Sequence, residues 1–234
     1  MRRTTSSTAR LACVCNFLLI GFLASVASAQ DPIFNGRDLT GWKGDMALWS
    51  VEDGAITGKT SAEKPIKENS FLVWEGELND FELSLKFRIV DGNSGIQFRS
   101  QSHGDFKVGG YQADIDAGMR YMGILYDERG RGILAERGEQ VVRAGDGKSE
   151  KKSLGLDDEK FKQSFKAGEW NTYVIRAEGN HITQTINGMK TVDFTDKEES
   201  ASDAKGILAL QIHVGPPMKV QFKDVVLKPL DQAK

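Results

Sequence analysis

The sequence predicts an all-β fold, a two-sheet antiparallel sandwich or jelly roll. About a dozen short stretches alternate apolar and polar residues, and turns rich in glycine, asparagine and aspartate separate them. The sequence contains no sustained helical period, internal repeat, coiled-coil heptad or phosphate-binding glycine loop. Short strands at such close spacing are typical of sandwiches and jelly rolls. We therefore expect two sheets packed face to face.

Residues 1–29 have the pattern of a secretory signal peptide. Arginines near the N-terminus precede a mostly apolar run at 11–26, and the small residues at 27–29 form a cleavage pattern. Both cysteines lie in this segment, so we expect a mature chain without a disulfide bond. We expect an exported protein, periplasmic or secreted, with a single domain over residues 30–234 and no membrane span after cleavage.

The charge distribution argues against nucleic acid as a partner. The net charge is −2, and no run of lysine and arginine in residues 30–234 is longer than a pair. Nucleic-acid binding generally needs a concentrated basic patch. A small or uncharged ligand is the better expectation.

The first part of the chain is expected to form an arm, a hairpin and a strand. Residues 33–42 are rich in turns, with few apolar anchors. Residues 48–51 and 55–58 flank Asp53-Gly54, a pair that tolerates the positive φ of a tight hairpin turn. The charged segment 61–69 contains a proline and predicts a loop, and residues 70–74 follow as a short apolar strand.

The middle of the chain contains the clearest strand. Residues 81–90 alternate apolar and polar side chains almost without a break, and residues 91–93 turn the chain into a second strand at 94–99. A third strand is expected at 109–116. Two more are expected at 122–126 and 132–136, with a charged turn at 127–131 between them.

The last part predicts a surface excursion, a meander and two final strands. Residues 145–160 are mostly charged and are expected to be irregular, with a short helical turn near 157–162. The meander comprises strands at 170–177, 181–186 and 189–194, and Asn187-Gly188 is a strong type I′ turn signal. The final strands are expected at 207–213 and 218–227, the latter with a bulge near Lys223-Asp224, where the apolar phase slips.

Polar side chains occupy one face of three of these strands. In 109–116, residues Tyr111, Ala113 and Ile115 suit a core, whereas the other face carries a polar row. The same parity gives polar rows on the strands at 94–99 and 207–213. An exposed sheet face would alternate in the same way, so the three rows form a site only if their strands share a face. The residues of the three rows are Gln97 and Arg99; Gln112, Asp114 and Asp116; and Gln211 and His213.

Several short motifs in a fixed order resemble one family. They are Phe34-Asn35-Gly36 with Gly41-Trp42, Asn93-Ser94-Gly95-Ile96 with Phe98-Arg99, Gly110-Tyr111-Gln112, Glu169-Trp170-Asn171, Asn187-Gly188, and Gly206-Ile207 with Gln211-Ile212-His213-Val214-Gly215-Pro216-Pro217. The ordered set resembles the 3-keto-disaccharide hydrolase domain family, whose fold is a concanavalin A-like lectin/glucanase sandwich. The resemblance covers nearly all of residues 30–234. The chain departs from the family's Glu-x-Gln-x-Asp pattern, with Gln112, Asp114 and Asp116 at those positions.

The resemblance implies an enzyme that cleaves 3-keto-glycosides, including 3-keto-disaccharides, in a pocket on the concave face. A separate sugar 3-dehydrogenase would supply the oxidised sugar. A ketone at carbon 3 acidifies the proton on carbon 2, so cleavage can proceed by elimination through an enolate before water adds. This route requires a base, a group that stabilises the oxyanion, and an acid for the leaving oxygen.

The polar rows offer candidates for these roles. His213 is the expected base or acid because its ordinary pKa lies near neutral pH. Asp114 and Asp116 are expected to act as base and acid, or to join His213 as ligands of a divalent metal ion, the possible cofactor. The remaining polar residues are expected to bind substrate: Arg99, Gln97, Gln112 and Gln211. Tyr126 and Lys190 are weaker candidates.

Two alternatives stay open at this point. Direct hydrolysis by Asp114 and Asp116 is compatible with their backbone separation of roughly 6.6 Å along one strand face, which lies between the spacings typical of retaining and inverting enzymes. The protein could also be a carbohydrate-binding module without catalysis. An enzyme predicts a deep pocket where His213 and the aspartates converge, whereas a binding module predicts a shallow groove with exposed aromatic side chains.

Overall fold

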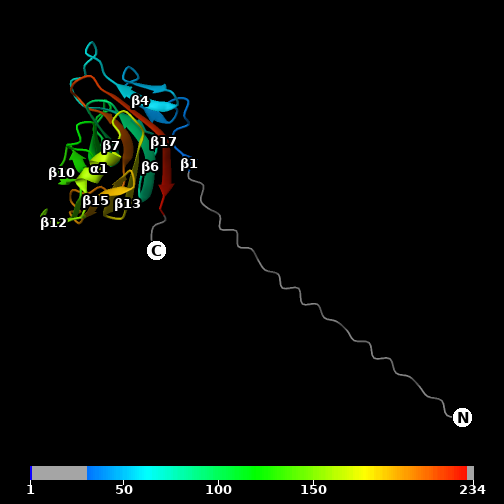
Figure 1. The fold of residues 1–234 in the computed structure, drawn as a ribbon, viewed down its shortest axis with the longest axis vertical. Helices are drawn as coiled ribbons and strands as arrows, with labels where there is room; N and C mark the ends of the chain where they lie inside the picture. The colour runs from blue at the N-terminus through cyan, green and yellow to red at the C-terminus, as the bar shows by residue number, and fades with distance from the viewer. Residues whose placement is uncertain (2–30, 231–234) are drawn as a thin grey trace.

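The computed structural model describes Met1 and residues 31–230, and these form a two-sheet β-sandwich with one short helix (Figure 1). The predicted signal peptide at 1–29 lies outside the described residues. None of the described helices has the length and apolar character needed to cross a membrane. The all-β sandwich predicted from the sequence is confirmed.

Within residues 31–230 the larger sheet has ten strands in the order β12-β11-β15-β14-β13-β6-β17-β4-β3, with β1 paired to β17. Neighbouring strands in this sheet are antiparallel except for the parallel pair β11 and β15. Its strands are β1 Asp31–Pro32, β3 Trp49–Glu52, β4 Ala55–Lys59, β6 Phe81–Ile89, β11 Glu139–Arg143, β12 Ser149–Ser153, β13 Asn171–Glu178, β14 His181–Ile186, β15 Met189–Asp196 and β17 Lys219–Pro229.

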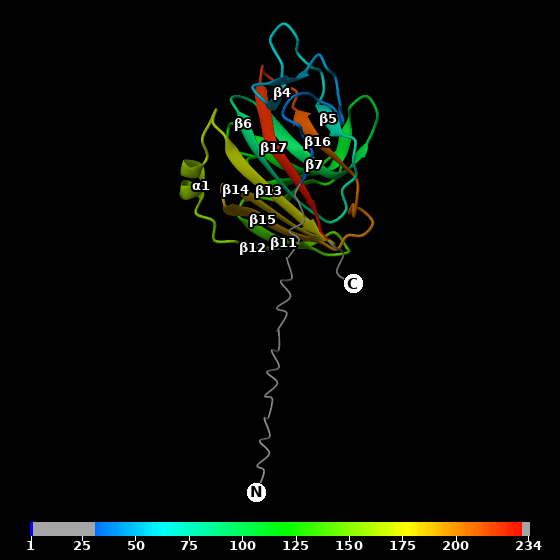
Figure 2. The ribbon, with the colours of Figure 1, turned by 90° about the vertical axis from the view of Figure 1, so that its right-hand side faces the viewer.

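The smaller sheet has seven strands in the same described part of the chain, in the order β10-β9-β8-β7-β16-β5-β2. Its strands are β2 Trp42–Lys43, β5 Ser70–Trp74, β7 Asn93–Ser102, β8 Val108–Asp116, β9 Leu125–Glu128, β10 Gly132–Ala135 and β16 Ile207–Ile212. Figure 2 shows the larger sheet face-on, with helix α1, Asp158–Ser164, at its edge. Asp157 is the N-cap of this helix, and its side chain accepts a hydrogen bond from the backbone N–H of Lys160. Asn187, in the β14–β15 turn, donates to the Ser164 carbonyl and so connects the helix to that turn.

The space between the sheets is filled by one large apolar cluster. Strand β6 buries every second side chain, from Phe81 to Ile89, as its alternation predicts. From the smaller sheet, Tyr111, Ala113 and Ile115 of β8 pack into the same cluster. The opposite face of β8, with its polar row, is therefore turned away from the larger sheet.

Turn chemistry explains the local topology. Asp53-Gly54 and Asn187-Gly188 both have positive φ at each residue, as tight hairpin turns require, and the three-strand meander β13-β14-β15 forms as predicted. The predicted bulge is also present. The register of β17 against β6 shifts between Lys223 and Val226, and Asp224 has a φ of 51°.

Three sequence predictions were wrong in detail. The surface excursion at 145–160 contains β12, a strand exposed along its whole length that lies at the sheet edge, where lysine and glutamate discourage further pairing. Strand β11 was not predicted. Strand β9 begins at Leu125 rather than at residue 122, because the preceding turn extends through Gly123, which has a φ of 76°.

The smaller sheet is curled, so that its outer face is concave. Strands β8, β7 and β16 separate β9 from β5, and along a flat sheet these two strands would be about 19 Å apart. Yet Glu128 of β9 accepts a hydrogen bond of 3.1 Å from Asn69, the residue before β5. Contact between side chains from such distant strands requires the sheet to fold toward itself over its outer face.

Candidate active site

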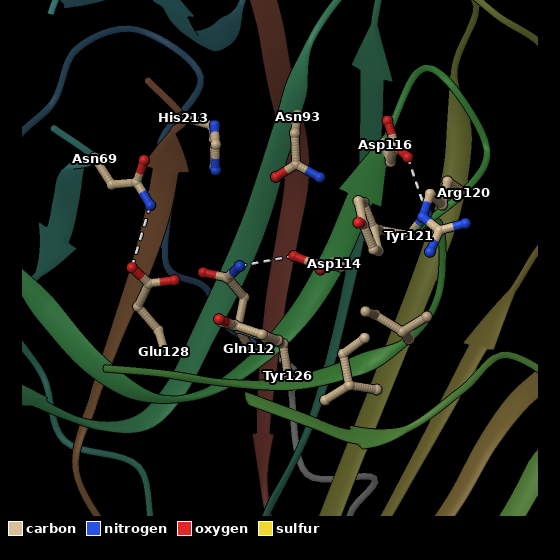
Figure 3. A pocket seen from close by; sticks show the side chains of 12 residues that line it. Asn69, Asn93, Gln112, Asp114, Asp116, Arg120, Tyr121, Tyr126, Glu128 and His213 are labelled. Atoms are coloured by element: carbon tan, nitrogen blue, oxygen red, sulfur yellow. Dashed lines mark hydrogen bonds between the residues drawn. The ribbon is translucent and has the colours of Figure 1, made fainter. Parts of the chain in front are cut away.

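The concave face holds a pocket of about 700 Å³, within the range typical of ligand sites. Figure 3 shows Gln112 and Asp114 in its central part, with His213, Asn93 and Asp116 along one side. The described side chains that line it are Asn69, Asn93, Gln112, Asp114, Asp116, Arg120, Tyr121, Ile124, Tyr126, Glu128, Ile133 and His213.

Strand register explains why these residues meet. Asn93 of β7 lies opposite Asp116 of β8, and His213 follows directly after β16 on the other side of β7. Two residue pairs further along, on the same face of the sheet, Gly95 lies opposite Asp114. A side chain at position 95 would collide with Gln112, so the glycine gives that glutamine room to lie across β7 beside Asp114.

Asp114 is held in a directed hydrogen-bond chain. Ser100 Oγ donates to Gln97 Oε1 at 2.6 Å, Gln97 Nε2 donates to Gln112 Oε1 at 2.8 Å, and Gln112 Nε2 donates to Asp114 Oδ1 at 2.7 Å. In the structure both amide groups donate toward Asp114. The chain presents an N–H group to Asp114 Oδ1, so Oδ2 is the oxygen available to carry a proton.

Burial makes Asp114 a carboxylic acid at neutral pH. Its side chain is almost fully buried, and desolvation raises its pKa from 3.8 to about 8. The nearby charges of Glu128 and Asp116 contribute to this raised pKa, while the hydrogen bond from Gln112 opposes it. A neutral carboxyl group in such a site is a hydrogen-bond donor and a general acid.

Asp116 serves the loop that follows it. Its Oδ1 accepts from the backbone N–H of Gly118 at 2.9 Å, and its Oδ2 accepts from the backbone N–H of Tyr121 at 2.8 Å. These two bonds hold the turn that places Arg120 and Tyr121 at the pocket wall. Asp116 lines the pocket as predicted, but both of its oxygens already have backbone partners.

His213 reaches the pocket in a defined tautomer. Its Nδ1 lies 2.6 Å from the carbonyl oxygen of Val214, which can only accept, so Nδ1 carries the proton. Nε2 of the neutral ring then has a free lone pair. The backbone N–H of Val214 donates to Asn69 Oδ1 at 2.9 Å, which fixes this segment against the pocket wall. His213 can therefore act as a base.

Four of the predicted site residues line the pocket, and three do not. Gln112, Asp114, Asp116 and His213 do. Gln97 lies one side chain away and reaches the site only through Gln112. Gln211 is on the expected face but is fully buried, and neither amide atom has a hydrogen-bond partner.

Arg99 was assigned to the wrong place. The register of β7 against β8 shifts between Gln97 and Gln101, and Arg99 has a φ of 48°. This bulge interrupts the alternation of side chains between the two faces of the strand. The buried guanidinium donates to the carbonyls of Asn79 and Gly179 and to Asp80, which lies just before β6. Arg99 thus joins the two sheets and does not line the pocket.

The arrangement does not fit the metal site predicted from Asp114, Asp116 and His213. No three histidine, cysteine, aspartate or glutamate side chains within the described residues are grouped so that they could hold a metal ion. Of the predicted ligands, Asp116 already accepts from two backbone amides.

The sequence interpretation missed Glu128 and Asn69. Glu128 was placed in a charged turn, but it belongs to β9, two residues beyond Tyr126, and both side chains line the pocket. The alternation of Leu125 and Asp127 inward with Tyr126 and Glu128 outward was the available signal. Asn69 carries no such signal, because it contacts Glu128 only when the sheet is curled.

Comparison with known proteins identifies the family. A model for the 3-keto-alpha-glucoside-1,2-lyase-like domain matches residues 30–228. The chain belongs to this family. The 3-keto-alpha-glucoside-1,2-lyase-like family is the one that the ordered motifs predicted, and its model spans both sheets and the pocket. No curated protein matches the chain.

Solved structures show the same fold at low sequence identity. A candidate glycosyl hydrolase from Parabacteroides distasonis is 18% identical with a TM-score of 0.59, covering 86% of this chain and all of its own. A second from the same organism is 23% identical with a TM-score of 0.56, covering 85% of this chain and 93% of its own. The carbohydrate-binding module CBM66 from Bacillus subtilis is 16% identical with a TM-score of 0.54, covering 80% of this chain and 95% of its own. At these identities the similarity establishes only the fold.

Proposed function

We propose that this protein is an exported enzyme that cleaves 3-keto-glycosides, including 3-keto-disaccharides, by acid/base-assisted elimination followed by addition of water. Family membership supports the substrate class. The observation that carries the proposal is Asp114, a buried carboxyl group with a pKa of about 8 whose Oδ2 is directed by a hydrogen-bond chain. A separate dehydrogenase that oxidises carbon 3 of the sugar would supply the substrate.

The elimination step assigns roles to two residues. His213 Nε2 removes the proton from carbon 2, and the C–H electron pair forms an enolate whose negative charge lies on the carbon 3 oxygen. Asp114 stabilises that oxygen by donating its proton in a hydrogen bond. The enolate then expels the substituent on carbon 1, forming a double bond between carbons 1 and 2, and the leaving oxygen takes the proton from the His213 imidazolium.

The second stage is addition of water to the enone. The hydroxyl group adds at carbon 1 and a proton returns to carbon 2, which releases the free 3-keto sugar. This route differs from direct hydrolysis by a pair of carboxylates. In such a pair the neutral Asp114 would be the acid and Asp116 the base or nucleophile, and both oxygens of Asp116 are already engaged by backbone amides.

Turnover of a 3-keto-disaccharide by the purified mature protein tests the proposal. We expect release of the reducing sugar, equal rates with and without a chelator, and an optical signal of the transient enone when water addition is slowed. Activity falls as pH rises through about 8, because Asp114 then loses the proton that it donates. The variant Asp114→Asn, which supplies an NH2 donor group but no acid, is expected to lose about 100-fold in kcat.

His213→Gln provides a second test, since it keeps a polar side chain but no base, and a loss of at least about 100-fold in kcat is expected. If the protein binds the 3-keto-disaccharide without turning it over, and both variants bind it equally well, the catalytic proposal is wrong. The carbohydrate-binding alternative would then hold.

A further inference from the structure

A second cavity adjoins the pocket. Its volume is about 420 Å³, and it shares three lining residues with the pocket, Asn93, Asp116 and His213. Asn93 and Asp116 are opposite each other across β7 and β8, and His213 follows β16. These three residues therefore form the boundary between the pocket and the adjoining cavity, and a ligand that enters both must cross them.

The two cavities differ in chemistry. Apart from the shared boundary, the adjoining cavity is lined by residues whose side chains provide no hydrogen-bond donor or acceptor: Gly92, Gly118, Val214, Gly215, Pro216 and Met218. The pocket, by contrast, offers an amide and two carboxyl groups from Gln112, Asp114 and Glu128, and the hydroxyl of Tyr126. Sugar hydroxyl groups that leave water need such partners, because burial of an unpaired polar group is costly.

Exposed apolar side chains give a second, independent indication. Apart from Met1, the described part of the chain exposes large hydrophobic side chains at Met46, Val90, Phe106, Tyr121, Ile133 and Val214. Tyr121 and Ile133 line the pocket, and Val214 lines the adjoining cavity. Half of this set thus surrounds the two adjacent cavities. Val214 in particular gives the adjoining cavity an exposed apolar side chain next to His213.

We propose that the adjoining cavity is the leaving-group subsite and that it selects aglycones with an apolar body, such as a benzyl group, over a second sugar. The proposal rests on the proposed function, because it places the 3-keto sugar in the pocket. The bond to be broken then lies over the boundary residues, where His213 faces both the ring and the leaving oxygen. An aglycone without hydroxyl groups loses no hydrogen bonds on entering.

Affinities of uncleaved glucosides test this subsite separately from catalysis. Methyl, benzyl and glucosyl glucosides that keep the carbon 3 hydroxyl group lack the acidified proton, so calorimetry reports binding alone. We expect the benzyl glucoside to bind at least tenfold more tightly than the other two. Val214→Asp places a charge in the cavity and is expected to remove most of that ratio. The segment is held by the backbone of Val214, so its side chain can be replaced.

Met46→Asp is the matched control, because Met46 is an exposed apolar residue that lines neither cavity. It is expected to leave the benzyl-to-methyl ratio unchanged. Equal affinity of the wild-type protein for the benzyl and methyl glucosides, or tighter binding of the glucosyl compound, overturns the proposal whether or not Val214→Asp folds. A ratio that survives in folded Val214→Asp also overturns it.

The corresponding 3-keto-glucosides then separate this proposal from the proposed function. All three release an alcohol whose oxygen His213 protonates, so differences in kcat/KM report the subsite more than leaving-group reactivity. A benzyl preference in both binding and kcat/KM supports both proposals. A benzyl preference in binding without turnover of any 3-keto compound supports the subsite and contradicts the enzyme. Turnover without a benzyl preference contradicts only the subsite.

Discussion

Asp114 combines burial with a single hydrogen-bond donor, and this combination sets its protonation. In the unfolded chain its pKa is near 3.8, whereas in the folded protein it is about 8. Between these values the folded state holds a proton that the unfolded state has released. Stability is therefore highest below the unfolded pKa, and it is lost as pH rises from about 4 to about 8.

This linkage predicts how Asp114→Asn changes stability. The variant lacks the titration, so its free energy of unfolding, relative to wild type, should increase with pH by at most about 1.4 kcal/mol per unit between pH 4 and 8 and level off above pH 8. Urea unfolding of both proteins from pH 5 to 9 measures this difference. A difference that stays constant over that range would contradict a raised pKa at Asp114.

Gln97 acts on Asp114 only through Gln112, which makes it a positioning residue. In Gln97→Leu the Gln112 amide loses the partner that fixes its orientation, so its N–H group no longer points reliably at Asp114. We expect kcat to fall about tenfold, a loss near 1.4 kcal/mol, with little change in KM. Because that hydrogen bond lowers the pKa of Asp114, the alkaline limb of the pH profile should also move to higher pH.

The control for Gln97 is Gln101→Leu, on the same strand but exposed. It should leave both kcat and the alkaline limb as in wild type. If Gln97→Leu lowers stability but changes neither kcat nor the alkaline limb of the pH profile, Gln97 has only a packing role.

At the scale of elements, the bulge in β7 gives two nearby polar residues different tasks. Before the bulge, the side chain of Gln97 lies on the same face as Gln112 and donates a hydrogen bond to it. After it, Arg99 crosses to the larger sheet, where its guanidinium is 1% exposed and bound to Asp80 and two backbone carbonyls. The bulge therefore separates a functional segment of β7 from a structural one.

Replacement of Arg99 should affect stability rather than the pocket. Arg99→Leu breaks the buried ion pair with Asp80 and removes the donor to the Asn79 and Gly179 carbonyls, so the free energy of unfolding should fall by about 3–5 kcal/mol. Arg176→Leu removes a largely exposed ion pair on β13 and should cost less than about 1 kcal/mol. Urea unfolding measures both. An effect of Arg99→Leu as small as that of Arg176→Leu would contradict the structural role.

At the scale of the whole molecule, curvature of the smaller sheet creates the pocket. Asn69 links the two sides of the curled sheet, because it donates to Glu128 and accepts from the backbone N–H of Val214, next to His213. The same residue thus closes the concave face and steadies the proposed base. Loss of Asn69 should therefore affect both shape and catalysis.

Asn69→Leu should lower kcat/KM about tenfold and the free energy of unfolding by about 1–2 kcal/mol, the range expected for lost hydrogen bonds to partly buried groups. Steady-state kinetics and urea unfolding measure the two effects. Asn180→Leu, at the exposed β13–β14 turn, is the matched control and should change neither quantity. Wild-type kinetics in Asn69→Leu would show that the hydrogen bonds of Asn69 to Glu128 and Val214 have no role in the site.

Alternation along the chain was enough to predict the sandwich and the face of β8 that carries Gln112, Asp114 and Asp116, because side chains on a strand point to opposite faces in strict turn. Turn residues such as Asn187-Gly188 and the phase slip near Lys223-Asp224 gave the meander and the bulge for similarly local reasons.

Only the tertiary structure decided what those polar groups do. A bulge moved Arg99 out of the row, and the loop after β8 used both oxygens of Asp116. Curvature brought Asn69 and Glu128 together and helped to raise the pKa of Asp114 through the charge of Glu128. Local sequence sets the direction of a side chain, but burial, charge and hydrogen bonding depend on residues from distant strands. The sequence therefore determined the strand that holds the site, and the fold decided the chemistry of Asp114.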